Sequence, residues 1–191
     1  MVVKKRLGFC IIVSAILLLS LSACRNKNES VFGVIEETDH KTIVQGTVDF
    51  DHQSFNSLTI QGTADLEDVT VKNDLVVQGS LEAEDCLLHN ITVYGNVALE
   101  ETKVSGKTQV FGRAEFDECS LQQVEIISKK AVFEECTALS VIVKGTEVGS
   151  TIILNNTQIL GDLLFEKGEG KVRLEGDSEV KGNIIGAMII E

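Results

Sequence analysis

The chain has 191 residues and contains no proline, no tryptophan and a single tyrosine, Tyr94. Proline cannot donate a backbone hydrogen bond, so its complete absence is compatible with long, uninterrupted β-ladders. The shortage of large aromatic side chains counts against a surface on which sugar rings stack.

Basic residues are also scarce, because 17 lysines and arginines stand against 29 acidic residues. A surface with this balance repels phosphate backbones and anionic lipid head groups. Nucleic-acid binding and peripheral binding to lipid are therefore poor hypotheses for this chain.

A long apolar run occurs near the N-terminus, where residues 7–19 follow a basic start at residues 4–6. The segment ends in Leu-Ser-Ala-Cys, with the cysteine at position 24. This ending resembles the lipobox of bacterial lipoproteins, which implies cleavage before Cys24 and lipid, including palmitate, on the new terminus. More than one acyl chain gives stable anchoring to a membrane.

On this interpretation residues 1–23 are a signal peptide, and residues 24–30 are the lipidated cysteine and a short polar tether. The protein is then exported and lipid-anchored, in the outer membrane if the cell is Gram-negative. An uncleaved anchor or an ordinary signal peptide is the alternative, although the run is shorter than the roughly 20 residues that span a bilayer.

From residue 46 to about residue 139, one short unit is written six times. Five columns of the unit hold apolar or small residues, which alternate with polar ones as in β-strands. A unit this short can bury its apolar row only by stacking on copies of itself, about 4.8 Å apart. Its first position, the opener, is filled at steps of 16 or 17 residues by Gly46, Gly62, Gly79, Gly95, Gly112 and Lys129.

The repeat predicts an all-β fold, a parallel β-helix or solenoid that forms a single domain over residues 31–191. About eight or nine coils would make a rod roughly 40 Å long. Right-handed winding is expected from the general handedness of parallel crossovers. Leucine-rich repeats have longer units of about 20 to 29 residues, and left-handed hexapeptide helices need a steadier period than this one.

The terminal coils are expected to be irregular. Residues 30–45 are interpreted as a degenerate first coil, and residues 146–150 and 167–171 as loops that lengthen the later coils. The C-terminal segment, residues 183–191, lacks the charges that usually protect an open sheet edge. It either folds over the last coil as a lid or docks another copy through Ile184, Ile185, Met188, Ile189 and Ile190.

Three cysteines share one interior column: Cys86, Cys119 and Cys136. We expect buried thiols that act as small apolar residues, with a disulfide between Cys119 and Cys136 as the alternative. The three histidines occupy different places in the unit, and no Cys/His pair has ligand spacing, so no metal site is expected.

Acidic residues fill two rows, five and six positions after the opener. They are interpreted either as a solvated corner that keeps the rod soluble or as a binding strip for weakly held divalent cations or a basic partner. No catalytic group of aspartate, histidine and arginine is recognisable, and the zinc, phosphate-loop and nucleophile motifs are absent, so we expect no enzyme. The residues of the two rows are Asp51, Glu67, Asp68, Glu84, Asp85, Glu100, Glu101, Asp117, Glu118, Glu134 and Glu135.

The glycine-punctuated, proline-free repeat over residues 46–190 resembles the bactofilins, polymer-forming bacterial β-helices. The resemblance implies end-to-end assembly through terminal coils and no nucleotide cofactor. The sequence thus predicts a membrane-anchored lipoprotein with a scaffolding role. The alternative is a monomeric binding or adhesion module of the cell envelope that uses the acidic face of the rod.

Overall fold

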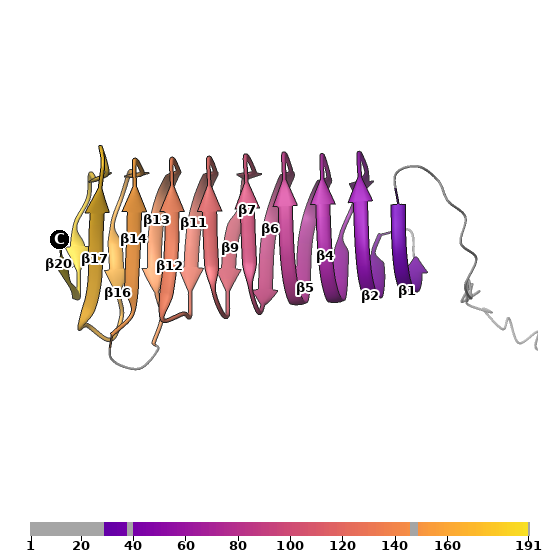
Figure 1. Cartoon of the computed structure of the whole chain (residues 1–191), viewed down its shortest axis with the longest axis horizontal. Helices are drawn as coiled ribbons and strands as arrows, with labels where there is room; N and C mark the ends of the chain where they lie inside the picture. Colours follow the sequence, from indigo (N-terminus) through magenta and orange to yellow (C-terminus); the bar gives the residue numbers. More distant parts are fainter. Residues whose placement is uncertain (1–28, 38–39, 146–148, 191) are drawn as a thin grey trace, which may run out of the picture.

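In the computed structural model, residues 29–37, 40–145 and 149–190 are described, and they form a rod of stacked β-coils (Figure 1). The rod is an all-β parallel solenoid of about nine turns, so the predicted fold class is confirmed. The predicted signal peptide, Cys24 and the tether up to residue 28 lie outside the described residues.

The strands follow one another with short turns between them. In chain order they are β1 (Glu29–Glu37), β2 (Thr42–Asp51), β3 (Ser54–Phe55), β4 (Leu58–Glu67), β5 (Thr70–Glu84), β6 (Leu87–Tyr94), β7 (Val97–Glu100), β8 (Lys103–Val104), β9 (Lys107–Val110), β10 (Ala114–Asp117), β11 (Ser120–Ile126), β12 (Lys130–Glu134), β13 (Thr137–Val143), β14 (Thr151–Asn155), β15 (Gln158–Ile159), β16 (Leu163–Phe165), β17 (Gly170–Glu175), β18 (Glu179–Val180), β19 (Ile184–Ile185) and β20 (Ala187–Ile190).

Each coil has three strand segments, so the rod has three faces. The opener face follows the first position of the unit and includes β7, β10, β12, β14 and β17. The short face includes β3, β8, β15 and β18, and the third face includes β9, β16 and β19. In the first coils one strand bends through several faces, as β5 does.

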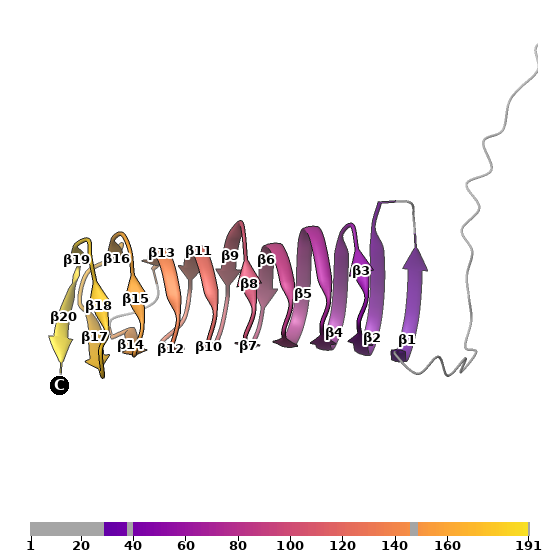
Figure 2. The ribbon, with the colours of Figure 1, turned by 90° about the horizontal axis from the view of Figure 1, so that it is seen from above.

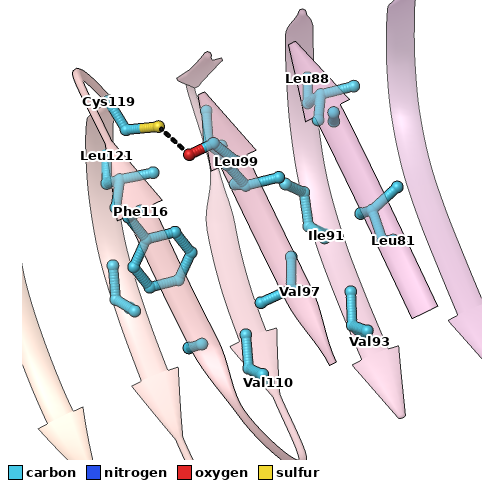
Figure 3. Close-up of a cluster of buried hydrophobic side chains, with 14 of the residues drawn as sticks. Leu81, Leu88, Ile91, Val93, Val97, Leu99, Val110, Phe116, Cys119 and Leu121 are labelled. Atoms are coloured by element: carbon cyan, nitrogen blue, oxygen red, sulfur yellow. Dashed lines mark hydrogen bonds between the residues drawn. The ribbon is translucent and has the colours of Figure 1, made fainter. Parts of the chain in front are cut away.

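Successive coils are stacked in register, with each repeat position over its copy. Phe116 pairs with Phe133, and their ring centroids are 4.9 Å apart. Side chains that point inward from the three faces form one continuous core (Figure 3). Burial of each large apolar side chain contributes about 1.5 to 3 kcal/mol, so this core is the main force that holds the coils together.

The glycine openers lie where the third face turns into the opener face. At Gly79 the φ angle is 144°, and an added Cβ would lie 2.0 Å from the backbone oxygen of Gly62. Glycine is required there because the backbones of adjacent coils touch. In the sixth unit, where Lys129 is the opener, the Ser128 hydroxyl holds the corner: it accepts from the Lys130 N–H at 3.1 Å and donates to the Lys130 carbonyl at 2.8 Å.

The N-terminal end is closed by an antiparallel strand. β1 runs back along β2, pairing Gly33 with Gly46, as Figure 2 illustrates. The interpretation of residues 30–45 as a degenerate parallel coil is therefore wrong for residues 30–37, whereas residues 42–45 do belong to the first coil, because Val44 pairs with Ile60. A strand of nine residues is too short for three faces, but it covers the backbone edge of β2.

The C-terminal segment continues the stack as the last coil. β19 pairs in parallel with β16, and β20 pairs in parallel with β17. The lid interpretation is therefore wrong: Ile184 lies over Leu163 and Ile189 lies over Val172, so the apolar residues of this segment extend the core columns instead of crossing them.

The longer steps of the later coils are absorbed at one corner. Residues 166–169 form a turn after β16, in which the Gly168 N–H donates to the Phe165 carbonyl at 3.2 Å. The loop predicted at residues 167–171 is confirmed for residues 167–169, whereas residues 170 and 171 belong to β17. Of the loop predicted at residues 146–150, residues 146–148 lie outside the described part of the chain.

Candidate functional site

The predicted acidic rows stand together along one edge of the opener face, which we call the acidic corner. In the first row, Glu84 pairs with Glu100, and Asp117 pairs with Glu134 on later coils. The structure thus brings the carboxylates of this row one above another. Their role, as a solvated corner or as a binding strip, stays a prediction.

The second row forms the turn from the opener face to the short face, in the left-handed backbone region. The φ angles are 52° at Asp85 and 46° at Glu101. This conformation is common for aspartate and asparagine but costs about 1 kcal/mol or more for most other residues. The N–H of Glu101 donates to the Asp117 carbonyl of the next coil at 3.1 Å, so the turn keeps the ladder continuous while the second-row side chains remain exposed.

The left-handed turn was not predicted, although its signal is present in the sequence. Asp68 and Asp85 in the row, and Asn156 one coil beyond it, are residue types that favour such turns. The row was interpreted from its charge alone.

Like charges raise the pKa values of two carboxyls in the acidic corner. The charge of Glu100 is the main cause at Glu84, and the charge of Glu101 is the main cause at Glu118. In the folded state these groups therefore hold a proton more tightly than usual, and a bound cation would relieve the same repulsion.

A shallow hollow of about 420 Å³ lies on the opener face beside the first acidic row. Ala98 and Val132 line it at the outward position that Asp65, Glu82 and Glu115 occupy in other coils. The hollow therefore combines a small apolar floor with carboxylate walls. Its chemistry suits a cationic group carried on an apolar stem.

His52 stands six positions after the opener Gly46, where the five later units have an acid, and it lies between two carboxylates. Its Nε2 is 3.2 Å from Oδ2 of Asp68, and its Nδ1 contacts Oδ1 of Asp51. The hydrogen bond with Asp51, together with that carboxylate's charge, raises the pKa of His52. In the sequence, His52 and Asp68 take the same position of successive units, but only histidines and Cys/His pairs were considered as metal ligands, so this cluster was missed.

The predicted cysteines are buried and unpaired, which confirms them as thiols. They also complete the turn beneath the acidic corner: the Cys119 thiol donates to the Leu99 carbonyl at 3.4 Å (Figure 3). The same thiol lies 3.1 Å from the Asp117 carbonyl, which also accepts from it. Thr102 takes the equivalent place one coil earlier, and its hydroxyl accepts from the Cys86 N–H at 3.2 Å. Burial raises the pKa of Cys86 to about 11, so that thiol is neutral.

Sequence reasoning also missed a polar network on the third face. The Glu125 carboxylate is 8% exposed and lies 2.7 Å from the Lys107 ammonium and 2.9 Å from the Lys144 ammonium. Gln109 donates to it at 2.9 Å. Burial alone would raise the pKa of Glu125, but these hydrogen bonds outweigh it and lower the pKa to about 2. The network joins three successive coils.

The residues predicted to dock another copy lie at the open end of the rod. Ile185, Met188 and Ile189 are exposed, whereas Ile184 and Ile190 are partly buried. The structure thus places all five on β19 and β20, in the last coil.

These features define the class of protein: a parallel β-solenoid with one acidic corner, β1 across one end and, among the described residues, an apolar last coil that no further strand covers. No protein family, no curated protein and no solved structure matches the chain. Within the part of the chain that the structure describes, no helix is long and apolar enough to cross a membrane.

Proposed function

We propose that this protein is a membrane-anchored bacterial lipoprotein with a scaffolding role, which assembles with further copies through its C-terminal coil. The lipobox that ends at Cys24 supports export and lipid anchoring. The β-solenoid fold is compatible with a structural role. The proposal assigns no catalytic residue and no cofactor.

The open C-terminal coil is the observation that carries this proposal. Val172 is fully buried, but its partner in the last coil, Ile189, is 61% exposed. Among the described residues, β18, β19 and β20 each pair with a strand of the preceding coil, and no strand pairs with them on the outer side. A second copy could cover this end, and burying each large apolar side chain would contribute about 1.5 to 3 kcal/mol.

Light scattering and electron microscopy of the full chain in mild detergent test the assembly. We expect oligomers that Ile189→Lys disperses, because an ammonium group would then be buried without a partner. Leu87→Lys is the matched control, since Leu87 is 56% exposed but lies on the short face. A monodisperse wild-type monomer, or oligomers that persist in Ile189→Lys, would count against assembly through this coil.

Anchoring is tested by Cys24→Ser. We expect the protein to move from the membrane fraction to the soluble fraction of the envelope and to lose labelling by radioactive palmitate. Membrane association and labelling that survive this substitution would overturn the proposed lipid anchor.

A second candidate function is the binding of a basic partner by the acidic corner, and the hollow over Ala98 favours it. A fluorescent decalysine peptide should bind the full chain with an affinity that falls as salt is raised. The double variant Glu82→Gln and Glu100→Gln should weaken binding, because both residues line the hollow. The control Glu175→Gln changes an exposed acid in a later coil, and an equal loss there would remove the assignment to the hollow.

A further inference from the structure

We propose that His52 and Asp68 bind a transition-metal dication of the Zn²⁺ type, and that Asp51 orients the imidazole. The inference is independent of the proposed scaffolding role. It also departs from the expectation that no metal site is present, because that expectation considered histidines and Cys/His pairs and not a histidine stacked beside carboxylates.

The donor atoms are already at the separation that a metal requires. Zinc bonds to histidine nitrogen and carboxylate oxygen are about 2.0 to 2.1 Å long, so two ligands of a tetrahedral ion lie about 3.3 Å apart. Nε2 of His52 and Oδ2 of Asp68 are 3.2 Å apart. The ligand atoms of Asp51, His52 and Asp68 all lie within 4.8 Å of one another.

The imidazole is held in the orientation that metal binding needs. Asp51 contacts Nδ1, so an Nδ1–H donated to this carboxylate leaves the lone pair of Nε2 directed toward Asp68. Histidine ligands of metals commonly donate their second N–H to a carboxylate in this way. The backbone is fixed as well, because the His52 N–H donates to the Glu67 carbonyl at 3.0 Å.

The donor set selects the class of metal. An imidazole nitrogen suits zinc, copper and nickel, whereas magnesium and calcium prefer sites made only of oxygen. The other coils of the acidic corner offer carboxylates alone, so the imidazole distinguishes this site from its neighbours. The His52 side chain is 63% exposed, and water can complete the coordination shell.

Isothermal titration calorimetry of the full chain with ZnCl₂ tests the site, together with NMR signals of the histidine rings. We expect the wild-type chain to bind one more zinc ion than the His52→Asn variant binds. Zinc should shift the ring signals of His52 and of no other histidine. Asparagine tolerates the left-handed turn, so His52→Asn should still fold. Asp51→Asn should weaken binding by roughly 10- to 100-fold, as loss of an orienting carboxylate does.

The control His89→Asn removes an exposed imidazole that pairs with the Ser105 hydroxyl at 3.0 Å, and it should leave zinc binding unchanged. Calcium and magnesium should not shift the His52 ring signals. Zinc binding that His52→Asn and Asp68→Asn leave intact would overturn the proposal, because the ion would then be held elsewhere.

A gain-of-site variant gives a second test. Asp85→His places an imidazole after Glu84 and one coil before Glu101, which reproduces the arrangement around His52. We expect the zinc stoichiometry to rise from one to two. An unchanged stoichiometry in a folded variant would show that stacked carboxylates around a histidine do not suffice, and would overturn the assignment.

Discussion

The two halves of the rod close the same corner in different ways. Up to residue 127 the coils advance by 16 or 17 residues, and the corner before each opener face is a single glycine whose backbone touches the coil below. In the second half, Leu154 follows Phe133 by 21 residues and Leu174 follows Leu154 by 20, while the extra residues are placed at that corner. The core columns nevertheless stay in register throughout.

The difference extends to the outer surface. The acidic rows run through the regular coils and are interrupted after Glu135, where Asn155 and Asn156 take the next two places; Glu175 occupies the first-row place of the following coil. Outward positions of the later coils hold partly buried apolar residues such as Ile153 and Leu164. The regular coils therefore carry the continuous acidic corner, whereas β14 and β16 of the later coils turn apolar side chains outward.

The largest expected effect tests whether the glycine corner is what keeps the first half tight. Gly79→Ala should destabilise the protein by more than about 3 kcal/mol, in the upper range for single substitutions, because its Cβ would meet the Gly62 carbonyl and separate two coils. Urea unfolding measures the loss.

Gly168→Ala is the matched change in the second half. Gly168 also has a positive φ angle, 71°, but an added Cβ meets no atom within 4 Å. It should cost only the backbone strain of about 1 to 2 kcal/mol. Equal losses for the two variants would show that backbone contact is not what distinguishes the corners.

Glu125 holds the two halves together, and its removal should have the second largest effect. Glu125→Ala leaves Lys107 and Lys144 without their shared carboxylate, and we expect a loss of about 2 kcal/mol, below the values for fully buried pairs because both lysines are partly exposed. Glu115→Ala breaks an exposed pair with Arg113 and should cost less than about 1 kcal/mol. Chemical denaturation of both variants checks the difference, and equal losses would contradict it.

Two buried threonines of the first half test how much a hydroxyl contributes inside the regular coils. Among the described residues, the Thr108 hydroxyl is buried without a hydrogen-bond partner, whereas the Thr102 hydroxyl donates to the Glu100 carbonyl at 2.9 Å. Thr108→Val should therefore stabilise the rod by about 1 kcal/mol, and Thr102→Val should destabilise it by about the same amount. Thermal unfolding should show shifts of opposite sign, and shifts of the same sign would refute this view of the two sites.

The stacking of the repeated coils could be predicted from the sequence, but the antiparallel strand that closes the N-terminal end could not. The apolar columns specified the stacking of Phe116 on Phe133 and of Glu84 on Glu100, because a period of 16 or 17 residues fixes the register. The antiparallel β1 was missed because its apolar positions fit either strand direction.

The sites were harder to predict than the stack. The His52 cluster and the Glu125 network depend on where side chains reach between coils. The acidic corner was predicted in place, because stacking alone aligns it. Its left-handed turn was not, because the row was interpreted from charge and not from backbone preference.

The smallest expected effect is the pH dependence, in which the acidic corner and Glu125 act in opposite directions. Glu84 and Glu118 have raised pKa values when folded, so the repulsion they cause is present at pH 7 and is relieved as pH falls toward the ordinary value of 4.5. The pKa of Glu125 is lowered to about 2, so its stabilisation is present above 4.5 and is lost as pH falls from 4.5 toward 2. Stability should thus rise from pH 7 to about pH 5 and fall below the ordinary carboxyl pKa of 4.5.

Urea unfolding over this pH range measures the curve, and substitutions separate its two limbs. The double variant Glu84→Gln and Glu118→Gln should flatten the rise, and Glu125→Gln should flatten the fall. His52, whose pKa is raised from 6.5, adds stability at low pH that is lost as pH rises through its folded value, so the double variant is best compared with wild type in a His52→Asn background. If the free energy of unfolding in that background does not change between pH 7 and 5, the stacked carboxylates are screened from one another. The acidic corner then does not destabilise the first half of the rod.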